Sequence, residues 1–307
     1  VQGLVSSLAA LVGCRMAIGV FEAPSFPANN KIVTQWFPEE ERASAIAVYT
    51  SGQFIGLAFL MPVLAVIQHS FGWRGLFLVS GAIGILWAII WYLVYRDPGE
   101  TGEAGQSKKP ATTQTVVNPA NLRIAFSNRK LWGIYIAQFC LGGTQIFFLT
   151  WFPTYLEESR GLSLIKTGAL ASIPYLAAFA GVLLSGFTSD FLVRKGFSRE
   201  FSRKAPIIFG LFLSSSVIGA NFVSSTSGAI FFLSLSFFGS GLASIAWVFV
   251  SLLAPKNMVG LVGGCFNFIG GLSAVVVPLA VGYLARHGDF RPALALISAR
   301  AVTGMLS

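Results

Sequence analysis

Apolar runs long enough to cross a lipid bilayer dominate this chain and leave little choice of fold. A membrane-spanning helix needs about 20 consecutive apolar residues. Nine runs are candidates, and they cover residues 1–28, 44–68, 76–95, 131–155, 165–192, 205–222, 229–253, 259–285 and 292–307. Lipid offers no hydrogen-bond partner to an open strand edge, so a spanning backbone is helical or forms a closed barrel. Runs of this length predict an all-α membrane bundle.

Composition and motifs exclude several other classes of protein. Only 11% of the residues are charged, against about a quarter in soluble domains, so a water-soluble globule is excluded. The three cysteines, Cys14, Cys140 and Cys265, are far apart and lie in apolar runs, which is typical of small buried residues rather than of a metal or redox site. The sequence contains no HExxH and no GxSxG motif. We therefore expect neither an enzyme nor a cofactor.

Lysine and arginine are distributed unevenly between the two sets of loops. Of 21 such residues, fourteen lie in the loops 29–43, 96–130, 193–204 and 254–258, and five lie in the alternate loops. Loops rich in Lys and Arg face the cytoplasm. This explains the net charge of +9 better than nucleic-acid binding does. It predicts a multi-pass membrane protein whose first helix runs inward.

The loop 96–130 divides the chain into two blocks of predicted helices. Its Gly-, Thr-, Ser- and Lys-rich sequence cannot bury a core and is typical of a flexible cytoplasmic linker. Residues 1–95 hold three candidate helices, and residues 131–307 hold six. The chain begins with Val inside an apolar run, so we expect helices that precede this segment to be absent and the chain alone to be inactive in transport.

Two opposite charges, Arg15 and Glu22, lie within the first apolar run. Ionic side chains are costly at that depth and usually mark a pathway. Seven residues make nearly two helical turns, so both side chains share a face, about 10.5 Å apart along the axis. That spacing is too long for a relaxed ion pair, so we expect an anion to partner Arg15 and a proton to partner Glu22. The alternative is a purely architectural polar network.

Four stretches of the chain resemble the major facilitator transporters. They are RMAIGVFEAPSFPANNKIVTQWFPEEERASAIAVYTSGQFIGLAFLMP, WFPTYLEESRGLS, PYLAAFAGVLLSGFTSDFLVRKGFS and GGCFNFIGGLSAVVVPLAVGYLA. Within that superfamily they are most similar to the sugar-acid:proton symporters of the anion:cation symporter family. The resemblance implies a helical bundle in two halves, with helices 4–6 in residues 1–95 and helices 7–12, the last incomplete, in residues 131–307. It places helices 1–3 outside this chain.

The resemblance also implies a function and roles for particular residues. It implies proton-coupled symport of a sugar acid such as D-galactonate, by a carrier that works as a monomer in lipid. A hexuronate or glucarate is an alternative substrate. A non-transporting anion sensor or an inactive transporter fragment is an alternative function. Proton coupling falls to Glu22, and substrate binding to Arg15, Gln53, Ser244, Trp247 and Asn267. In the run GFTSDFLVRKG, which is similar to the signature loop of the superfamily, Asp190 and Arg194 would lock one access state.

Some of these assignments also have a physical basis of their own. Gln53 and Asn267 lie in the middle of apolar runs, where an unpaired amide is costly. Their donors and acceptors suit a solute rich in hydroxyl groups, although a hydrogen bond between helices is the alternative. Taken alone, Trp247 is as compatible with helix packing as with stacking on a sugar. Ser244 alone is a weaker indication still, because serine often bonds to the backbone of its own helix. Gln138 and Gln145 share a helical face, and for them packing and cavity lining are equally weighted alternatives.

Overall fold

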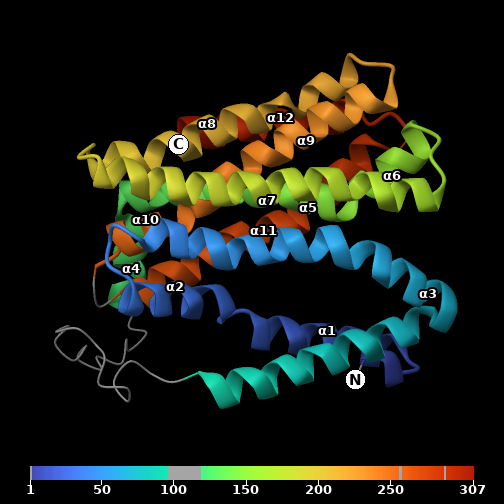
Figure 1. The fold of residues 1–307 in the computed structure, drawn as a ribbon, viewed down its shortest axis with the longest axis horizontal. Helices are drawn as coiled ribbons and strands as arrows, with labels where there is room; N and C mark the ends of the chain where they lie inside the picture. The colour runs from blue at the N-terminus through green and yellow to red at the C-terminus, as the bar shows by residue number, and fades with distance from the viewer. Residues whose placement is uncertain (1, 96–118, 256–257, 287) are drawn as a thin grey trace.

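The computed structural model describes residues 2–95, 119–255, 258–286 and 288–307, and those residues form helices joined by short loops (Figure 1). The elements are η1 (Gln2–Leu4), α1 (Leu8–Glu22), α2 (Ser25–Trp36), α3 (Arg42–Val94), α4 (Pro119–Ser127), α5 (Arg129–Thr150), α6 (Phe152–Thr154), η2 (Tyr155–Ser159), α7 (Leu164–Arg194), α8 (Arg199–Ser214), η3 (Ser215–Asn221), α9 (Thr226–Ala243), η4 (Ser244–Ala246), α10 (Trp247–Leu253), α11 (Val259–Leu284) and α12 (Arg291–Leu306). The predicted all-α membrane fold is thereby confirmed.

Eight segments of the described chain are long and apolar enough to cross a membrane. They are Leu8–Trp36, Arg42–Leu64, Ser70–Val94, Arg129–Thr150, Lys166–Arg194, Arg199–Asn221, Thr226–Leu253 and Val259–Leu284. The ninth predicted run forms α12, which has 16 residues and is shorter than these eight. Residues 96–118 of the predicted linker lie outside the described residues. Within the rest of the predicted linker, Pro119–Ser127 form helix α4.

The first predicted span begins and ends later than the apolar run indicated. The Ser7 hydroxyl oxygen accepts a hydrogen bond from the Ala10 amide at 3.2 Å, so Ser7 caps α1 and the helix begins at Leu8. Pro24 has no amide hydrogen to continue the helix, and α2 begins at Ser25. The chain therefore breaks between two helices at this proline, and α1 and α2 together form one segment that is long and apolar enough to cross a membrane.

Helix α3 contains two membrane crossings joined by a sharp turn. Gly72 has φ of +67° there, in the left-handed region that favours glycine. Figure 1 shows the second half of α3 returning beside α1, away from the main bundle. Neither α1 nor this second half buries residues within the described structure. The bundle proper is built from the first half of α3 and from α5 to α12.

An aromatic cluster around Phe237 of α9 forms the centre of the bundle. The Phe237 ring stacks on Phe148 with 4.1 Å between centroids. Tyr175 and Phe54 contact it edge-on at 5.3 Å and 5.5 Å. These residues come from α5, α7 and α3, so the cluster ties the N-terminal block to the C-terminal block. All four side chains are 2% exposed or less.

Helices α8 and α9 approach each other through glycines, and this packing yields a testable prediction. A methyl group on Gly239 would meet the Gly210 carbonyl oxygen and would lie 2.6 Å from the Ser214 amide nitrogen. Gly239→Ala is therefore expected to lower the free energy of unfolding by about 1–3 kcal/mol. Thermal unfolding in detergent micelles measures this change.

A matched glycine on α11 provides the control. Nothing lies within 4 Å of a methyl group on Gly264. Because alanine forms helices better than glycine by about 1 kcal/mol, Gly264→Ala is expected to leave stability unchanged or to raise it slightly. Equal unfolding temperatures for the two variants would contradict the close approach of α8 and α9.

Candidate functional site

A small polar cavity of about 170 Å³ lies between the two blocks of helices. Four of the residues predicted to contact a substrate line it: Gln53, Ser244, Trp247 and Asn267. The other described lining residues are Phe26, Thr50, Gln138, Leu141, Gly142, Gln145, Ile146, Gly270, Gly271, Ser273 and Ala274. They come from α2 and α3 on one side and from α5, η4, α10 and α11 on the other. The structure thus brings together residues up to 248 positions apart in the sequence, Phe26 and Ala274.

Hydrogen bonds already occupy some of the polar groups in this cavity. The Gln145 amide nitrogen donates to the Ser244 hydroxyl at 3.5 Å. The Ser244 hydroxyl in turn donates to the Ser240 carbonyl at 2.9 Å. The Asn267 amide nitrogen donates to the Ala23 carbonyl at 3.4 Å. By contrast, the Gln138 carbonyl oxygen and the Thr50 hydroxyl are buried and have no partner among the described residues. A buried polar atom without a partner is costly unless a ligand or water satisfies it.

Trp247 is packed into an aromatic stack at the edge of the cavity. Its ring is 5.6 Å from the Phe26 ring, at 13° between planes, and 4.8 Å from Phe266, edge-on. Phe26 also contacts Tyr49 at 6.2 Å. Because Phe26 stacks on one face of the Trp247 ring, that face is closed to a ligand.

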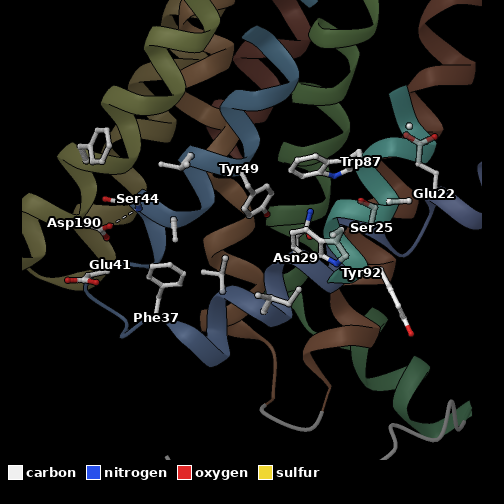
Figure 2. Close-up of a pocket in the computed structure, with 18 of the residues that line it drawn as sticks. Glu22, Ser25, Asn29, Phe37, Glu41, Ser44, Tyr49, Trp87, Tyr92 and Asp190 are labelled. Carbon is white, nitrogen blue, oxygen red and sulfur yellow. Dashed lines mark hydrogen bonds between the residues drawn. The ribbon is translucent and has the colours of Figure 1, made fainter. Parts of the chain in front are cut away.

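Glu22 lies outside the polar cavity, on the wall of a larger groove. This groove has a volume of about 2400 Å³ and is bounded by α1, α2, α7 and both halves of α3. Figure 2 shows the Glu22 side chain at one end of it, with Ser25, Asn29 and Tyr49 further along. Since Tyr49 lines this groove and touches Phe26, which lines the polar cavity, the pair lies between the two spaces.

Arg15 lines neither cavity in the described chain. Its side chain is exposed, and its guanidinium lies 5.5 Å from the centroid of the Phe77 ring. The ion pairs among the described residues do not include one between Arg15 and Glu22. The structure therefore does not bring Arg15 to the four predicted substrate-contacting residues.

A buried carboxylate, Asp190, joins the two blocks at the ends that the loop charges predict to be cytoplasmic. Its side chain forms an ion pair with Arg203 of α8, and the exposed fractions of the two residues are 2% and 1%. Its second oxygen accepts a hydrogen bond from the Ser44 amide at 2.6 Å. Ser44 is in the first turn of α3, where free amides and the helix dipole favour a negative charge. Asp190 of the C-terminal block thus caps a helix of the N-terminal block.

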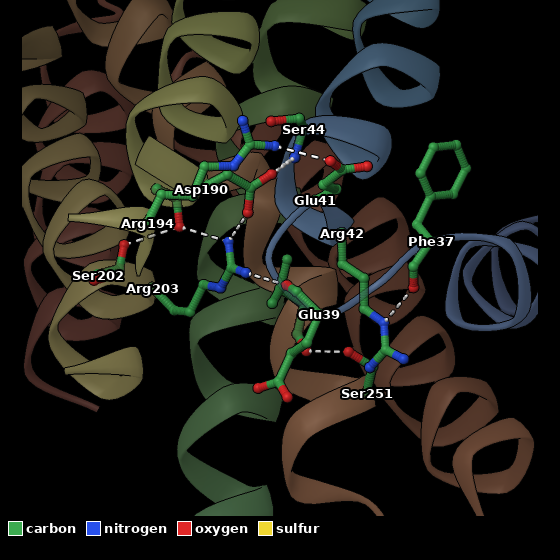
Figure 3. Close-up of polar contacts among 12 residues, drawn as sticks. Phe37, Glu39, Glu41, Arg42, Ser44, Asp190, Arg194, Ser202, Arg203 and Ser251 are labelled. Atoms are coloured by element: carbon green, nitrogen blue, oxygen red, sulfur yellow. Dashed lines mark hydrogen bonds and ion pairs between the residues drawn. The ribbon is translucent and has the colours of Figure 1, made fainter. Parts of the chain in front are cut away.

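Further contacts extend this junction (Figure 3). Arg203 also donates to the Ser189 hydroxyl at 3.0 Å and to the Glu39 carbonyl at 2.6 Å. On the surface, Arg194 pairs with Glu41 at 3.0 Å and Arg199 pairs with Glu39 at 2.9 Å. Asp190 and Arg194, which lie four residues apart on α7, therefore bind different partners. Each contacts the opposite block of the chain.

Sequence reasoning missed two contributors to these sites, Thr50 and Arg203. Thr50 precedes Gln53 by three residues, so a helical pattern could have placed both on one face. For Gln138 and Gln145 the sequence left packing and cavity lining open, and both residues line the polar cavity. Arg203 lies in a basic stretch that reads as an ordinary cytoplasmic loop, and no local signal distinguishes it from its exposed neighbours.

Comparison with known proteins identifies relatives along the entire chain. The family model described as Major Facilitator Superfamily matches residues 1–278. A D-galactonate transporter of Escherichia coli O6:H1 is 46% identical over 100% of this chain and 75% of its own length. A probable galactarate/D-glucarate transporter of Bacillus subtilis is 37% identical, over 97% of this chain and 69% of its own length. A hexuronate transporter of the same species is 32% identical, over 99% of this chain and 73% of its own length.

Solved structures share the fold at low identity. A fucose transporter of this superfamily in an outward conformation superposes with a TM-score of 0.66 at 16% identity, over 94% of this chain and 72% of that one. A bacterial homologue of the human lysosomal transporter Spinster, in an inward-facing conformation, superposes with a TM-score of 0.60 at 17% identity, over 99% of this chain and 75% of that one. These likenesses support the helical arrangement alone.

Proposed function

Because the chain belongs to the Major Facilitator Superfamily, we propose that it carries a small organic anion together with protons across the bacterial inner membrane. Its sugar-acid-transporting relatives and its membrane-crossing helices support this function. The substrate we propose is a sugar acid of the D-galactonate type. Proteins of this architecture move solutes by rocking two helical blocks around a central site.

The observation that carries the proposal is the polar cavity between the two blocks. Carboxamides from three different helices, Gln53, Gln138 and Asn267, line one cavity in a largely apolar bundle. Such groups offer several donors and acceptors, which suits a hydroxyl-rich solute. We propose that Gln53, Ser244 and Asn267 form hydrogen bonds to the hydroxyl groups of this solute, while Trp247 forms part of the cavity wall.

The charged residues have separate roles in this proposal. Glu22, beside the large groove, carries the proton, and Arg15 attracts the anion. Residues 1–95 and 131–307 act as the two rocking halves. The junction of Asp190 and Arg203 with the start of α3, together with the Arg194 pair, holds the cytoplasmic side closed until the halves rock. We propose that the carrier acts as a lipid-embedded monomer, without cofactor or catalytic role.

Uptake into proteoliposomes tests this function. An inward proton gradient is expected to drive uptake of radiolabelled D-galactonate, and dissipating the gradient is expected to stop accumulation. Asn267→Ala removes an amide from the cavity and is expected to raise the KM about tenfold, the effect of losing one to two hydrogen bonds to the solute.

Asn221 provides the matched control. Its amide donates to the Arg291 carbonyl at 3.0 Å, away from the cavity. Asn221→Ala is therefore expected to leave the KM unchanged. If the reconstituted full-length protein takes up no sugar acid under the gradient, the proposed function is wrong.

A further inference from the structure

We propose that Asn30 of α2 biases the protein toward opening on its cytoplasmic side. The amide is buried without a partner between the two blocks when that side is closed, and water reaches it when the blocks separate. Asn30 lines neither the polar cavity nor the larger groove. The inference therefore goes beyond the proposed solute site, and it rests on the proposed function only for the rocking of the two blocks.

Asn30 is the most deeply buried residue of α2. Its exposed fraction is 1%, and Val33, at 5%, is the other buried residue of this helix. The amide nitrogen and the carbonyl oxygen of the Asn30 side chain both lack a hydrogen-bond partner among the described residues. Residues of this chain alone enclose the amide, so another helix could not reach it unless the packing around it changed. The missing partner is therefore a property of α2 and the helices that surround it.

The face of α2 that carries Asn30 meets the opposite block. Helix α2 packs against α3 of its own block and against α10 and α11 of the C-terminal block. Phe26, four residues before Asn30, stacks on Trp247 of α10. Pro27, three residues before it, has its Cβ 3.8 Å from the position that a methyl group on Gly263 of α11 would take. Residues three and four apart share a helix face, so Asn30 points toward the same two helices, about 6 Å along the axis from Phe26.

The part of the C-terminal block that α2 meets is apolar, which explains why the amide has no partner. The side chains that the structure describes as buried between residues 247 and 262 are aliphatic, aromatic or thioether groups. They are Trp247, Val248, Phe249, Val250, Ala254, Met258 and Val262. Against such a surface an amide loses its hydration and gains no hydrogen bond.

Closing the cytoplasmic side therefore has a cost at Asn30 that opening removes. A carboxamide has two N–H donors and an oxygen that accepts two hydrogen bonds. In the closed arrangement all of these are unused, which is unfavourable for a buried polar group. When α2 separates from α10 and α11, water satisfies them. The junction of Asp190 with Arg203 acts in the opposite direction, so together these residues keep the closed and open states close in free energy.

The distance between the cytoplasmic ends of the two blocks tests the inference. Pulsed electron paramagnetic resonance measures it between spin labels at Gln35→Cys on α2 and Lys195→Cys directly after α7, two exposed positions. The full-length protein is used, with its native cysteines replaced and no solute added. Asn30→Leu keeps a similar side-chain size and removes the unpaired amide. It is expected to lower the ratio of open to closed molecules about tenfold, the effect of one buried polar group without a partner.

Two further variants separate polarity from size and from general disturbance. Asn30→Ala also removes the amide but leaves a smaller side chain, so it is expected to lower the same ratio by less than Asn30→Leu does. Asn221→Leu removes an amide that has a partner, the Arg291 carbonyl at 3.0 Å, within the C-terminal block. This variant is expected to leave the ratio unchanged.

Each other outcome contradicts one of the two proposals. An unchanged or raised ratio in Asn30→Leu would overturn the bias, and so would a fully closed population of the unaltered protein. Opposite shifts in Asn30→Ala and Asn30→Leu would overturn it as well, because size rather than polarity would then set the equilibrium. Absence of sugar-acid uptake would overturn the proposed function and leave this inference standing, since the distances are recorded without solute.

Discussion

Arg203→Met is expected to lower the free energy of unfolding by about 3–5 kcal/mol, because it leaves a buried carboxylate without its counter-charge. Asp190 is 2% exposed and depends on Arg203 and the Ser44 amide for its charge balance. Thermal or denaturant unfolding in detergent micelles measures the loss.

Arg194→Met is the matched control on the same junction. The Arg194 and Glu41 side chains are 59% and 47% exposed, and exposed pairs contribute at most about 1 kcal/mol. The double variant Asp190→Asn with Arg203→Met removes both buried charges, so it is expected to recover much of the lost stability. If Arg203→Met and Arg194→Met are equally stable, the buried pair does not hold the two blocks together.

Glu22→Gln is expected to abolish proton-driven accumulation while leaving exchange of labelled for unlabelled substrate. Glutamine keeps the shape of the side chain but binds no proton in this pH range. For one proton carried per anion, a gradient of about one pH unit supplies about tenfold accumulation. The variant is expected to stop at equal concentrations inside and outside. Radiolabel uptake and exchange into proteoliposomes, measured side by side, distinguish the two activities.

Glu200 is the appropriate control for this substitution. Its side chain is 73% exposed at the start of α8, where it pairs with Lys204. Glu200→Gln is expected to accumulate substrate as the unaltered protein does. Undiminished accumulation by Glu22→Gln would remove the proton-coupling role from this residue.

The membrane fold could be predicted from sequence because its signal is local. The length and hydropathy of each apolar run are enough to predict that it spans the membrane, and the spans found in the structure follow the predicted runs. The exceptions are also local in cause. Ser7 and Pro24 move the boundaries of the first span through one cap and one missing amide hydrogen. Gly72 lets two runs form one element with a sharp turn.

The candidate site could be predicted only in part because its contacts are distant in sequence. Polar residues inside apolar runs identified Gln53 and Asn267, since an amide there is conspicuous. Helical periodicity put Arg15 and Glu22 on one face, but it carries no information about which cavity that face meets. Arg203 was hidden for a different reason. The number of Lys and Arg residues in the loops predicts the orientation in the membrane. Such a count does not show that the Arg203 guanidinium is buried while its neighbours are exposed.

The cap that Asp190 places on α3 has a consequence for how such a protein would move. The first turn of α3 is completed by a carboxylate from the opposite block, through the Ser44 amide. Pulling the blocks apart on this side would strip that turn of its acceptor and expose Arg203 and Asp190 to water. Cytoplasmic opening would therefore resemble the fraying of one helix end coupled to the hydration of an ion pair. The free energy of this opening would then depend on salt concentration and on helix-stabilising substitutions in α3 that lie far from the solute-binding cavity.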